Sequence, residues 1–433
     1  MTSVALVVLD TLRADSFEEH FDWLDGATFT RAYSSSHWTI PAHASLFTGR
    51  YASEVGTTGT SPSLDWTGQT LAEAFQEAGY RCRALNANTQ LSQYEGWERG
   101  FNLFEGAANL GRIDDSIFDW GRHIDATEPG IERYLSGIWG CLTEDCNTME
   151  SLQYGYGLVK RPAWDGGARA VRRRLEHMEV EDEEFLFVNL MDTHTPYHPP
   201  PGSEDPVTVV IADAFADGVT EPEKIRAAYR AATTDLAEVY RDIVAILETE
   251  YEYVITLSDH GELLGEHGLW NHSVGLHPEL VHVPLVVNGP DIESGYRHEP
   301  VNLLDVHRTV AELASVDVAS NGRDLFGLLE PKELLFESHG LLPFHRSQFE
   351  RVDAPLKEFE RWQTDLAGFV TKDGAYYYES EPGEFAVIGK TKERAPRDRL
   401  EELKTELDRR EVEPAEIDIT NEVRKRLEEL GYA

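Results

Sequence analysis

Short, uninterrupted apolar runs are the feature that most restricts the fold of this chain. Residues 4–9 read VALVVL, and three further segments rich in apolar residues, at 183–192, 251–259 and 282–290, are expected to be strands of the same kind. A strand with one face in water alternates apolar and polar residues, whereas a strand of a parallel sheet is buried on both faces and stays apolar throughout. We therefore expect these runs to form a mostly parallel sheet at the centre of the protein.

Segments with helical periodicity separate these apolar runs. They lie at 67–80, 166–180, 222–250 and 301–316, and a further expected strand at 81–88 follows the first of them. Strands that alternate with helices are typical of βαβ units, which place helices on both faces of a sheet. The predicted fold class is α/β, with a doubly wound, mostly parallel sheet.

The sequence changes in character from about Leu366. Residues 368–388 alternate polar with apolar side chains around Asp373-Gly374, which is a hairpin signal, and charged helical segments follow. We expect a catalytic α/β domain over 1–345 and a small antiparallel α+β subdomain over 346–433. The segment 106–165 is irregular and rich in Gly, Trp and Tyr, as expected for an insertion near a site.

The charge of the chain excludes several partners. It has 39 basic and 78 acidic residues, a net charge of −39, and the acidic residues are spread along its whole length. Such a field repels nucleic acid and anionic lipid, and its self-repulsion is tolerable where salt screens it, so the composition resembles that of halophilic archaeal proteins. No run approaches the ~20 apolar residues that a membrane span needs. Three cysteines and a start without a signal-peptide pattern favour a cytoplasmic location.

Three of the expected strands end in, or are followed by, carboxylate or imidazole side chains. Asp10 ends the first, His194 follows the strand at 183–192, and Asp259-His260 ends the strand at 251–259. In open α/β sheets, ligands bind at the carboxyl ends of the strands. A single Asp at a strand end is usually a turn or cap residue, but three such ends together predict a site.

Asp10, Asp259 and His260 supply two carboxylates and one imidazole, a set that suits a divalent cation such as Mn, Mg, Ca or Zn. Thr39 would complete this ligand set through its hydroxyl, whose pKa a bound cation lowers, and would then act as a nucleophile. Pro41 marks the first turn of a helix whose N–H groups would face an incoming anion. Taken alone, Thr39 could equally be a helix N-cap.

Four segments of the chain read VVLDTLRAD, WTIPAHASLFTGRY, THTPYHPP and LSDHGELLGEHGLWNH. Their order and spacing are those of the sulfatases within the alkaline phosphatase superfamily, and the chain resembles that family over roughly residues 3–345. The resemblance implies a doubly wound α/β fold with a C-terminal subdomain. It also implies a hydrolase acting on sulfuric or phosphoric ester bonds.

Two departures from the family pattern matter. Thr39 stands where sulfatases have a Cys or Ser that is converted to formylglycine, so this conversion is not expected here. Asp10-Thr11 replaces two consecutive Asp residues. In these respects the chain looks more like the phosphodiesterase, phosphonate hydrolase and phosphoglycerol transferase branches.

The resemblance also suggests roles for residues around the nucleophile. His272 stands where the family has a basic residue and would act as general acid or anion binder, with His194 as its counterpart on another strand. Asn88, near a family Lys position, would hydrogen-bond the substrate, and His43 replaces a family Arg and would orient the nucleophile. His198 is a candidate for substrate binding, although its place between prolines also fits a stacking residue.

The function predicted from the sequence is a metal-dependent hydrolase of sulfate or phosphate (di)esters, with Thr39 as nucleophile and one firmly bound divalent metal. A second, weaker metal site would draw on His194, His198, His267 or His272. The expected substrate is a small anionic ester, such as a sulfated or phosphorylated sugar or lipid head group. Two alternatives stay open: a phosphoryl-group transferase of the phosphoglycerol transferase type, and a non-catalytic anion-binding protein on the same scaffold.

Overall fold

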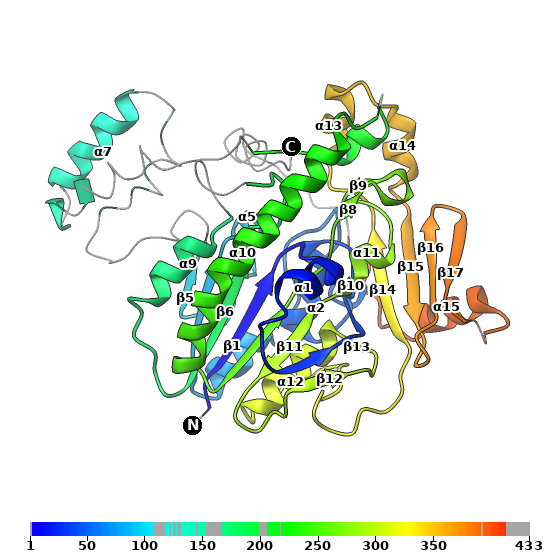
Figure 1. The fold of residues 1–433 in the computed structure, drawn as a ribbon, viewed down its shortest axis with the longest axis horizontal. Helices are drawn as coiled ribbons and strands as arrows, with labels where there is room; N and C mark the ends of the chain where they lie inside the picture. The colour runs from blue at the N-terminus through cyan, green and yellow to red at the C-terminus, as the bar shows by residue number, and fades with distance from the viewer. Residues whose placement is uncertain are drawn as a thin grey trace.

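Strand β1 (Val4–Leu9) lies at the centre of an eight-stranded sheet. The computed structural model describes residues 2–106, 166–198, 206–216, 218–390 and 393–412, and parts of 118–152. All six residues of β1 are fully buried, because the strand has neighbours on both sides and helices on both faces (Figure 1). The unbroken apolar run at 4–9 is therefore a strand that is buried on both faces, as predicted.

The sheet has the strand order β12-β2-β11-β7-β1-β6-β4-β5. Its parallel part consists of β5 (Leu103–Glu105), β4 (Arg81–Asn86), β6 (Glu184–Leu190), β1 and β7 (Tyr253–Leu257). Antiparallel pairing begins at β11 (Leu285–Asn288), which is followed at the edge by β2 (Ala27–Phe29) and β12 (Gly295–Arg297). The predicted α/β class with a doubly wound, mostly parallel sheet is confirmed.

Helices cover the two faces of this sheet in separate groups. One face carries α1 (Ala14–His20), α9 (Ala168–Leu175) and α10 (Pro222–Glu250), and both α1 and α9 pack against α10. The other carries α2 (Thr39–Thr48), α4 (Leu71–Glu77) and α12 (Leu303–Leu313). Even α10, the longest of the described helices, is amphipathic, and no described helix is both long and apolar enough to cross a bilayer.

The predicted strand at 282–290 is divided in the structure. Pro284 has no N–H to offer a ladder, and it separates β10 (His282–Val283) from β11. Strand β10 pairs instead with β3 (Ala32–Tyr33), and β3 also pairs with β13 (Val301–Asn302) to form a second, three-stranded sheet. The start of the segment predicted as a helix at 301–316 is therefore strand, and α12 begins at Leu303.

A separate four-stranded antiparallel sheet occupies the right of Figure 1, and it consists of β14 (Leu334–His339), β15 (Asp365–Val370), β16 (Tyr376–Glu381) and β17 (Glu384–Ile388). The predicted hairpin at Asp373-Gly374 joins β15 to β16, and Gly374 supplies the positive φ of +83° that this turn requires. The subdomain division at 345/346 remains a proposal, and β14 lies on its N-terminal side. The expected helix after residue 420 and most of 106–165 fall outside the described residues.

The remaining elements are short connections around these layers, except for the longer helix α7. They are α3 (Ala52–Val55), α5 (Thr89–Gln93), α7 (Ile131–Thr143), β8 (Leu263–Leu264), β9 (Trp270–Asn271), α11 (Pro278–Val281), α13 (His345–Arg351), α14 (Leu356–Arg361) and α15 (Pro396–Thr405), with 3-10 turns at Ile211–Ala214 and Glu266–Gly268. The three cysteines, at positions 82, 141 and 146, form no disulfide.

Glu337 on β14 joins the small sheet to the segment that precedes α2. Its backbone N–H donates to Ser35 O at 2.9 Å, and Ser36 Oγ donates to its carbonyl at 2.7 Å. Its buried carboxylate accepts from Ser53 Oγ at 3.0 Å and pairs with Arg409 at 3.1 Å and His339 at 3.4 Å. This one residue thus fixes the approach to α2 through both its backbone and its charge.

We expect Glu337→Gln to destabilise the protein by up to about 3 kcal/mol at neutral pH, because it leaves buried positive charge without its partner. Burial opposes charge on His339, but Glu337 and Asp365 outweigh it and raise the pKa of His339 from 6.5 to about 9. The stabilisation is therefore complete below pH 6.5 and is lost as the pH rises through 9. Denaturant unfolding should show that the difference in free energy of unfolding between wild type and variant narrows as the pH rises between these values. Glu384→Gln, at an exposed position of β17, is the control. A difference that stays constant with pH would contradict the pairing of Glu337 with a charged His339.

Candidate active site

Four adjacent strands bring the predicted site residues to one edge of the sheet. In the order β7, β1, β6 and β4, their carboxyl ends lead into Asp259-His260, Asp10, His194 and Asn88. Thr39 faces them from the N-terminus of α2, so residues that are far apart in the sequence converge on a single cluster.

The two carboxylates each have one oxygen held by donors and one left over. Asp10 Oδ2 accepts hydrogen bonds from Asn88 Nδ2 at 2.9 Å and Asn189 Nδ2 at 3.3 Å. Asp259 Oδ1 accepts from the N–H of His260 at 3.0 Å and of Thr11 at 3.4 Å. Within the described residues, Asp10 Oδ1 and Asp259 Oδ2 are buried and accept no hydrogen bond. Buried oxygens of this kind usually have a partner, so both are candidate ligands for a cation.

His260 presents the third atom of the cluster. Its Nδ1 lies 2.9 Å from Gly261 O, which places the ring proton on Nδ1 and leaves the Nε2 lone pair for a ligand. Nε2 lies 3.4 Å from Asp259 Oδ2 and 3.8 Å from Asp10 Oδ1. The three ligand atoms all lie within 4.8 Å of one another, a spacing that one divalent ion can bridge.

The electrostatics of the cluster also favour the binding of a divalent ion. Asp10 and Asp259 are fully buried, and burial raises the pKa of each from 3.8 to about 7; the charge of Asp259 adds to the effect on Asp10. Burial likewise lowers the pKa of His260. Two desolvated carboxylates beside a neutral imidazole lack a compensating positive charge, and a divalent cation would supply it. The residues present therefore fit a divalent metal ion.

Thr39 is the first residue of α2 and is 1% exposed. Its Oγ1 lies 3.3 Å from His260 Nε2 and 3.5 Å from Asp10 Oδ2. The N-cap position belongs to Trp38, whose side chain makes no capping hydrogen bond, so Thr39 is not an N-cap. The hydroxyl is thus directed at the acid–imidazole cluster instead of at its own helix.

His43 contacts the backbone of Thr39 and not its hydroxyl. Its Nδ1 lies 2.9 Å from Thr39 O, one turn back along α2, and Asn189 Nδ2 donates to its Nε2 at 3.2 Å. Burial lowers the pKa of His43 to about 3, so the ring is neutral and carries its proton on Nδ1. Asn189 thereby connects His43 to Asp10.

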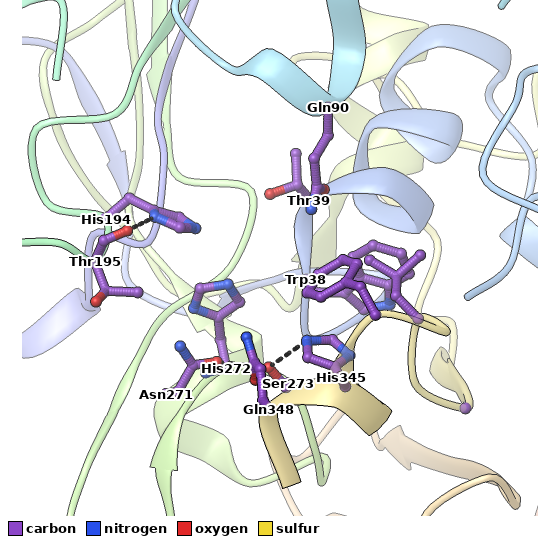
Figure 2. A pocket seen from close by; sticks show the side chains of 13 residues that line it. Trp38, Thr39, Gln90, His194, Thr195, Asn271, His272, Ser273, His345 and Gln348 are labelled. Carbon is purple, nitrogen blue, oxygen red and sulfur yellow. Dashed lines mark hydrogen bonds between the residues drawn. The ribbon is translucent and has the colours of Figure 1, made fainter. Parts of the chain in front are cut away.

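A narrow pocket opens beside Thr39, and His194 and His272 line it (Figure 2). The rings of these histidines have centroids 4.8 Å apart, and the ring of His272 lies 4.6 Å from that of His260. His272 Nδ1 is 3.1 Å from Glu262 Oε1, and burial raises the pKa of that carboxyl to about 8 while lowering that of His272. At neutral pH this pair is a protonated carboxyl beside a neutral imidazole.

The structure separates two other histidines from this pocket. His198 is half-buried and does not belong to its lining. His267 stacks on His277, with ring centroids 3.8 Å apart, and its Nε2 lies 3.3 Å from Glu279 Oε2. Within the part of the chain that the structure describes, the cluster at Asp10 is the one group of three or more potential metal ligands.

Several residues of the site were not predicted as part of it. Asn189 is the only polar residue inside the apolar run FLFVNL, and that interruption was a usable signal. Glu262 lies three residues beyond Asp259, in the loop that follows β7. The pocket wall formed by Leu342, Phe344 and His345 follows β14 and carries no recognisable motif.

A protein-family model with the description Sulfatase matches residues 19–316, which is more than half of the chain. The chain belongs to the sulfatase family. The predicted enzyme class, a hydrolase acting on ester bonds, is thereby confirmed, as is the predicted superfamily.

Known proteins agree with this membership. The uncharacterized sulfatase YidJ of Escherichia coli (strain K12) is 24% identical over 411 residues, which cover 83% of this chain and 75% of YidJ. The phosphonate monoester hydrolase SpPMH from Silicibacter pomeroyi superimposes with a TM-score of 0.59 at 17% identity, covering 94% of both chains. BT1596, a 2-O GAG sulfatase, gives a TM-score of 0.61 at 13% identity, covering 94% of this chain and 91% of its own. The structural likenesses show a shared fold.

Proposed function

We propose that this sulfatase-family chain is a metal-dependent hydrolase of monoanionic esters, namely sulfate monoesters or phosphate diesters, with Thr39 as nucleophile. The observation that carries the proposal is the position of Thr39 Oγ1, 3.3 Å from His260 Nε2 and 3.5 Å from Asp10 Oδ2. Asp10, Asp259 and His260 would hold a divalent cation together with the Thr39 hydroxyl. That cation would lower the pKa of the hydroxyl and offset the two carboxylate charges.

The charge balance of the site supports a substrate group with one negative charge. Neither Lys nor Arg lines the pocket or the acid–imidazole cluster among the described residues. Burial lowers the pKa of His43, His194 and His272, so none of them adds a positive charge at neutral pH. Two carboxylates and one divalent ion sum to zero, and a dianionic phosphate monoester would bring a second negative charge that nothing here neutralises.

The side chains divide the chemistry between two sides of the substrate. Thr39 Oγ1 would release its proton to water and form a bond to sulfur or phosphorus as the bond to the departing ester oxygen, in line with it, breaks. The N-terminus of α2 would face the transferring group. His272 would give the proton on Nε2 to that oxygen and take one on Nδ1 from Glu262, 3.1 Å away. Water would then release the group from Thr39. Asn88, whose Nδ2 lies 3.5 Å from Thr39 Oγ1, would hydrogen-bond the substrate.

A panel of chromogenic esters tests this assignment. With added Mn²⁺, Mg²⁺, Ca²⁺ or Zn²⁺ at high salt, we expect kcat/KM for bis-para-nitrophenyl phosphate or para-nitrophenyl sulfate to exceed that for para-nitrophenyl phosphate by about 100-fold or more, since an unneutralised buried charge costs several kcal/mol. High salt is chosen because the net charge of −39 favours a halophilic setting in which salt screens the charge. A preference for the phosphate monoester would overturn the charge argument.

A further inference from the structure

Asn189 is a polar side chain in the most deeply buried part of the central sheet. It is the penultimate residue of β6, a strand in which every residue is buried, and it is itself 0% exposed. The strands on either side of β6 are β1 and β4, which lead to Asp10 and Asn88. Withdrawing an amide from water costs stability unless its hydrogen bonds are replaced, so the contacts of this side chain indicate what it does.

The amide nitrogen of Asn189 serves two acceptors at once. It donates to Asp10 Oδ2 at 3.3 Å and to His43 Nε2 at 3.2 Å. These partners fix the orientation of the amide, because a carboxylate oxygen only accepts and His43 Nε2 accepts when the ring proton on Nδ1 faces Thr39 O. The amide oxygen is buried and has no hydrogen-bond partner among the described residues. The side chain thus keeps both donor contacts although its acceptor stays unpaired.

His43 carries this connection to the nucleophile. Its Nδ1 lies 2.9 Å from Thr39 O and 3.5 Å from Asp259 Oδ2, whereas Asn189 holds the opposite nitrogen of the ring. Each of these side chains is at most 1% exposed. A buried chain of contacts therefore runs from Asp10 through Asn189 and His43 to the first peptide group of α2.

We propose that Asn189 is a positioning residue, which fixes the cation ligand Asp10 relative to the start of α2 and so sets the spacing between the cation ligands and the Thr39 hydroxyl. Its bond to Asp10 Oδ2 leaves Oδ1 for the cation. Its bond to His43 Nε2 keeps the ring proton on Nδ1, where it meets Thr39 O. The inference rests on the proposed function for the roles of Asp10 and Thr39.

Asn189→Ala and Asn189→Val test this proposal, because the first leaves a cavity and the second fills it. In the metal-loaded protein, both should lower kcat for the preferred chromogenic ester by about 10- to 100-fold while KM stays within about threefold, as expected when a hydrogen bond to a metal ligand is lost. Calorimetric titration of the metal-free proteins with Mn²⁺ should show an affinity about tenfold lower than that of wild type. Asn189→Val should shift the Tm of the metal-free protein by less than about 2 °C, because it removes the unpaired amide oxygen together with the two donors.

Val188→Ala is the matched control. Val188 is the preceding residue of β6, it is fully buried, and its side chain points to the opposite face of the sheet. Shortening it should lower Tm by about 3 °C or more through lost core packing, with kcat and Mn²⁺ affinity within about twofold of wild type. A purely structural role for Asn189 would give the same pattern in its own variants.

A double-mutant cycle tests whether Asn189 acts through His43. His43→Leu and Asn189→Val break the same chain of contacts, so the double variant should lose at most about twofold more kcat than the worse single variant. Losses that multiply would show that the two residues act independently, and they would overturn the proposal.

The inference is also overturned by near-wild-type kcat in both Asn189 variants, by unchanged Mn²⁺ affinity, or by a loss of kcat in Asn189→Ala that is absent from Asn189→Val. The last result would be a packing effect. Failure of the proposed function gives a different outcome. In that case the wild-type protein turns over none of the chromogenic esters, whereas the loss of Mn²⁺ affinity persists in the Asn189 variants and is absent from Val188→Ala.

Discussion

Thr39→Ala should reduce turnover of the preferred ester by roughly 10⁴-fold or more, as expected when a nucleophile is removed from a site that otherwise stays intact. The methyl group fits the space of the threonine side chain, and the carboxylates that would hold the cation keep their donors at Asn88, Asn189 and the backbone. Metal affinity should therefore weaken only in part. Steady-state kinetics and calorimetric titration with Mn²⁺ measure the two effects separately.

Thr39→Ser is the control for this result, because it keeps the hydroxyl and should retain most of the activity. A covalent adduct on Thr39, trapped by rapid acid quench and detected by mass spectrometry, should be present in the wild-type protein and absent from the alanine variant. Near-full activity in Thr39→Ala would show that another group attacks the substrate.

Divalent metal should stabilise the protein strongly, and more so at pH 8 than at pH 5. The pKa of Asp10 and of Asp259 rises from 3.8 to about 7 on burial, so between these values the metal-free folded state holds protons that the unfolded chain has released. The metal-free protein therefore loses stability as the pH rises through this window. A cation needs the ionised carboxylates, so its contribution increases over the same range and reaches about 2.7 kcal/mol at a hundredfold excess over Kd.

Thermal unfolding with and without Mn²⁺, at both pH values and in high salt, measures this effect. Asp259→Asn should abolish most of the metal-dependent rise in Tm, whereas Asp182→Asn, at an exposed carboxylate, should leave it unchanged. A metal-induced rise that is equal at pH 5 and pH 8 would mean that the cation binds elsewhere.

The central sheet and the metal-binding cluster could be predicted because their signals are local. Complete burial of β1 produces an unbroken apolar run, and a carboxylate at the end of such a run stands out. Since parallel strands end at the same edge, Asp10 and Asp259-His260 could be expected to meet without knowledge of the strand order. The helix at 222–250 was predictable for a similar reason, since Pro222 and its apolar spacing mark it along its whole length.

The residues that were missed depend on tertiary contacts. Asn189 is important because its side chain reaches both Asp10 and His43, and no spacing rule gives such a contact. Glu262 can be assigned a role only because the turn after β7 places its carboxyl beside His272. The connection after β14 lines the pocket only because the four-stranded sheet lies beside the central one. The division of 282–290 at Pro284 likewise follows from the presence of the three-stranded sheet.

The strand order also has a consequence for biosynthesis. β7 pairs directly with β1, although 249 positions separate Val8 from its partner Leu257. A nascent chain must therefore keep the open edge of β1 available until the ribosome has added residues up to about 260, and only then can both carboxylates share an ion. Metal uptake would accordingly report completion of the sheet, and fragments ending before β7 should be unable to retain the ion.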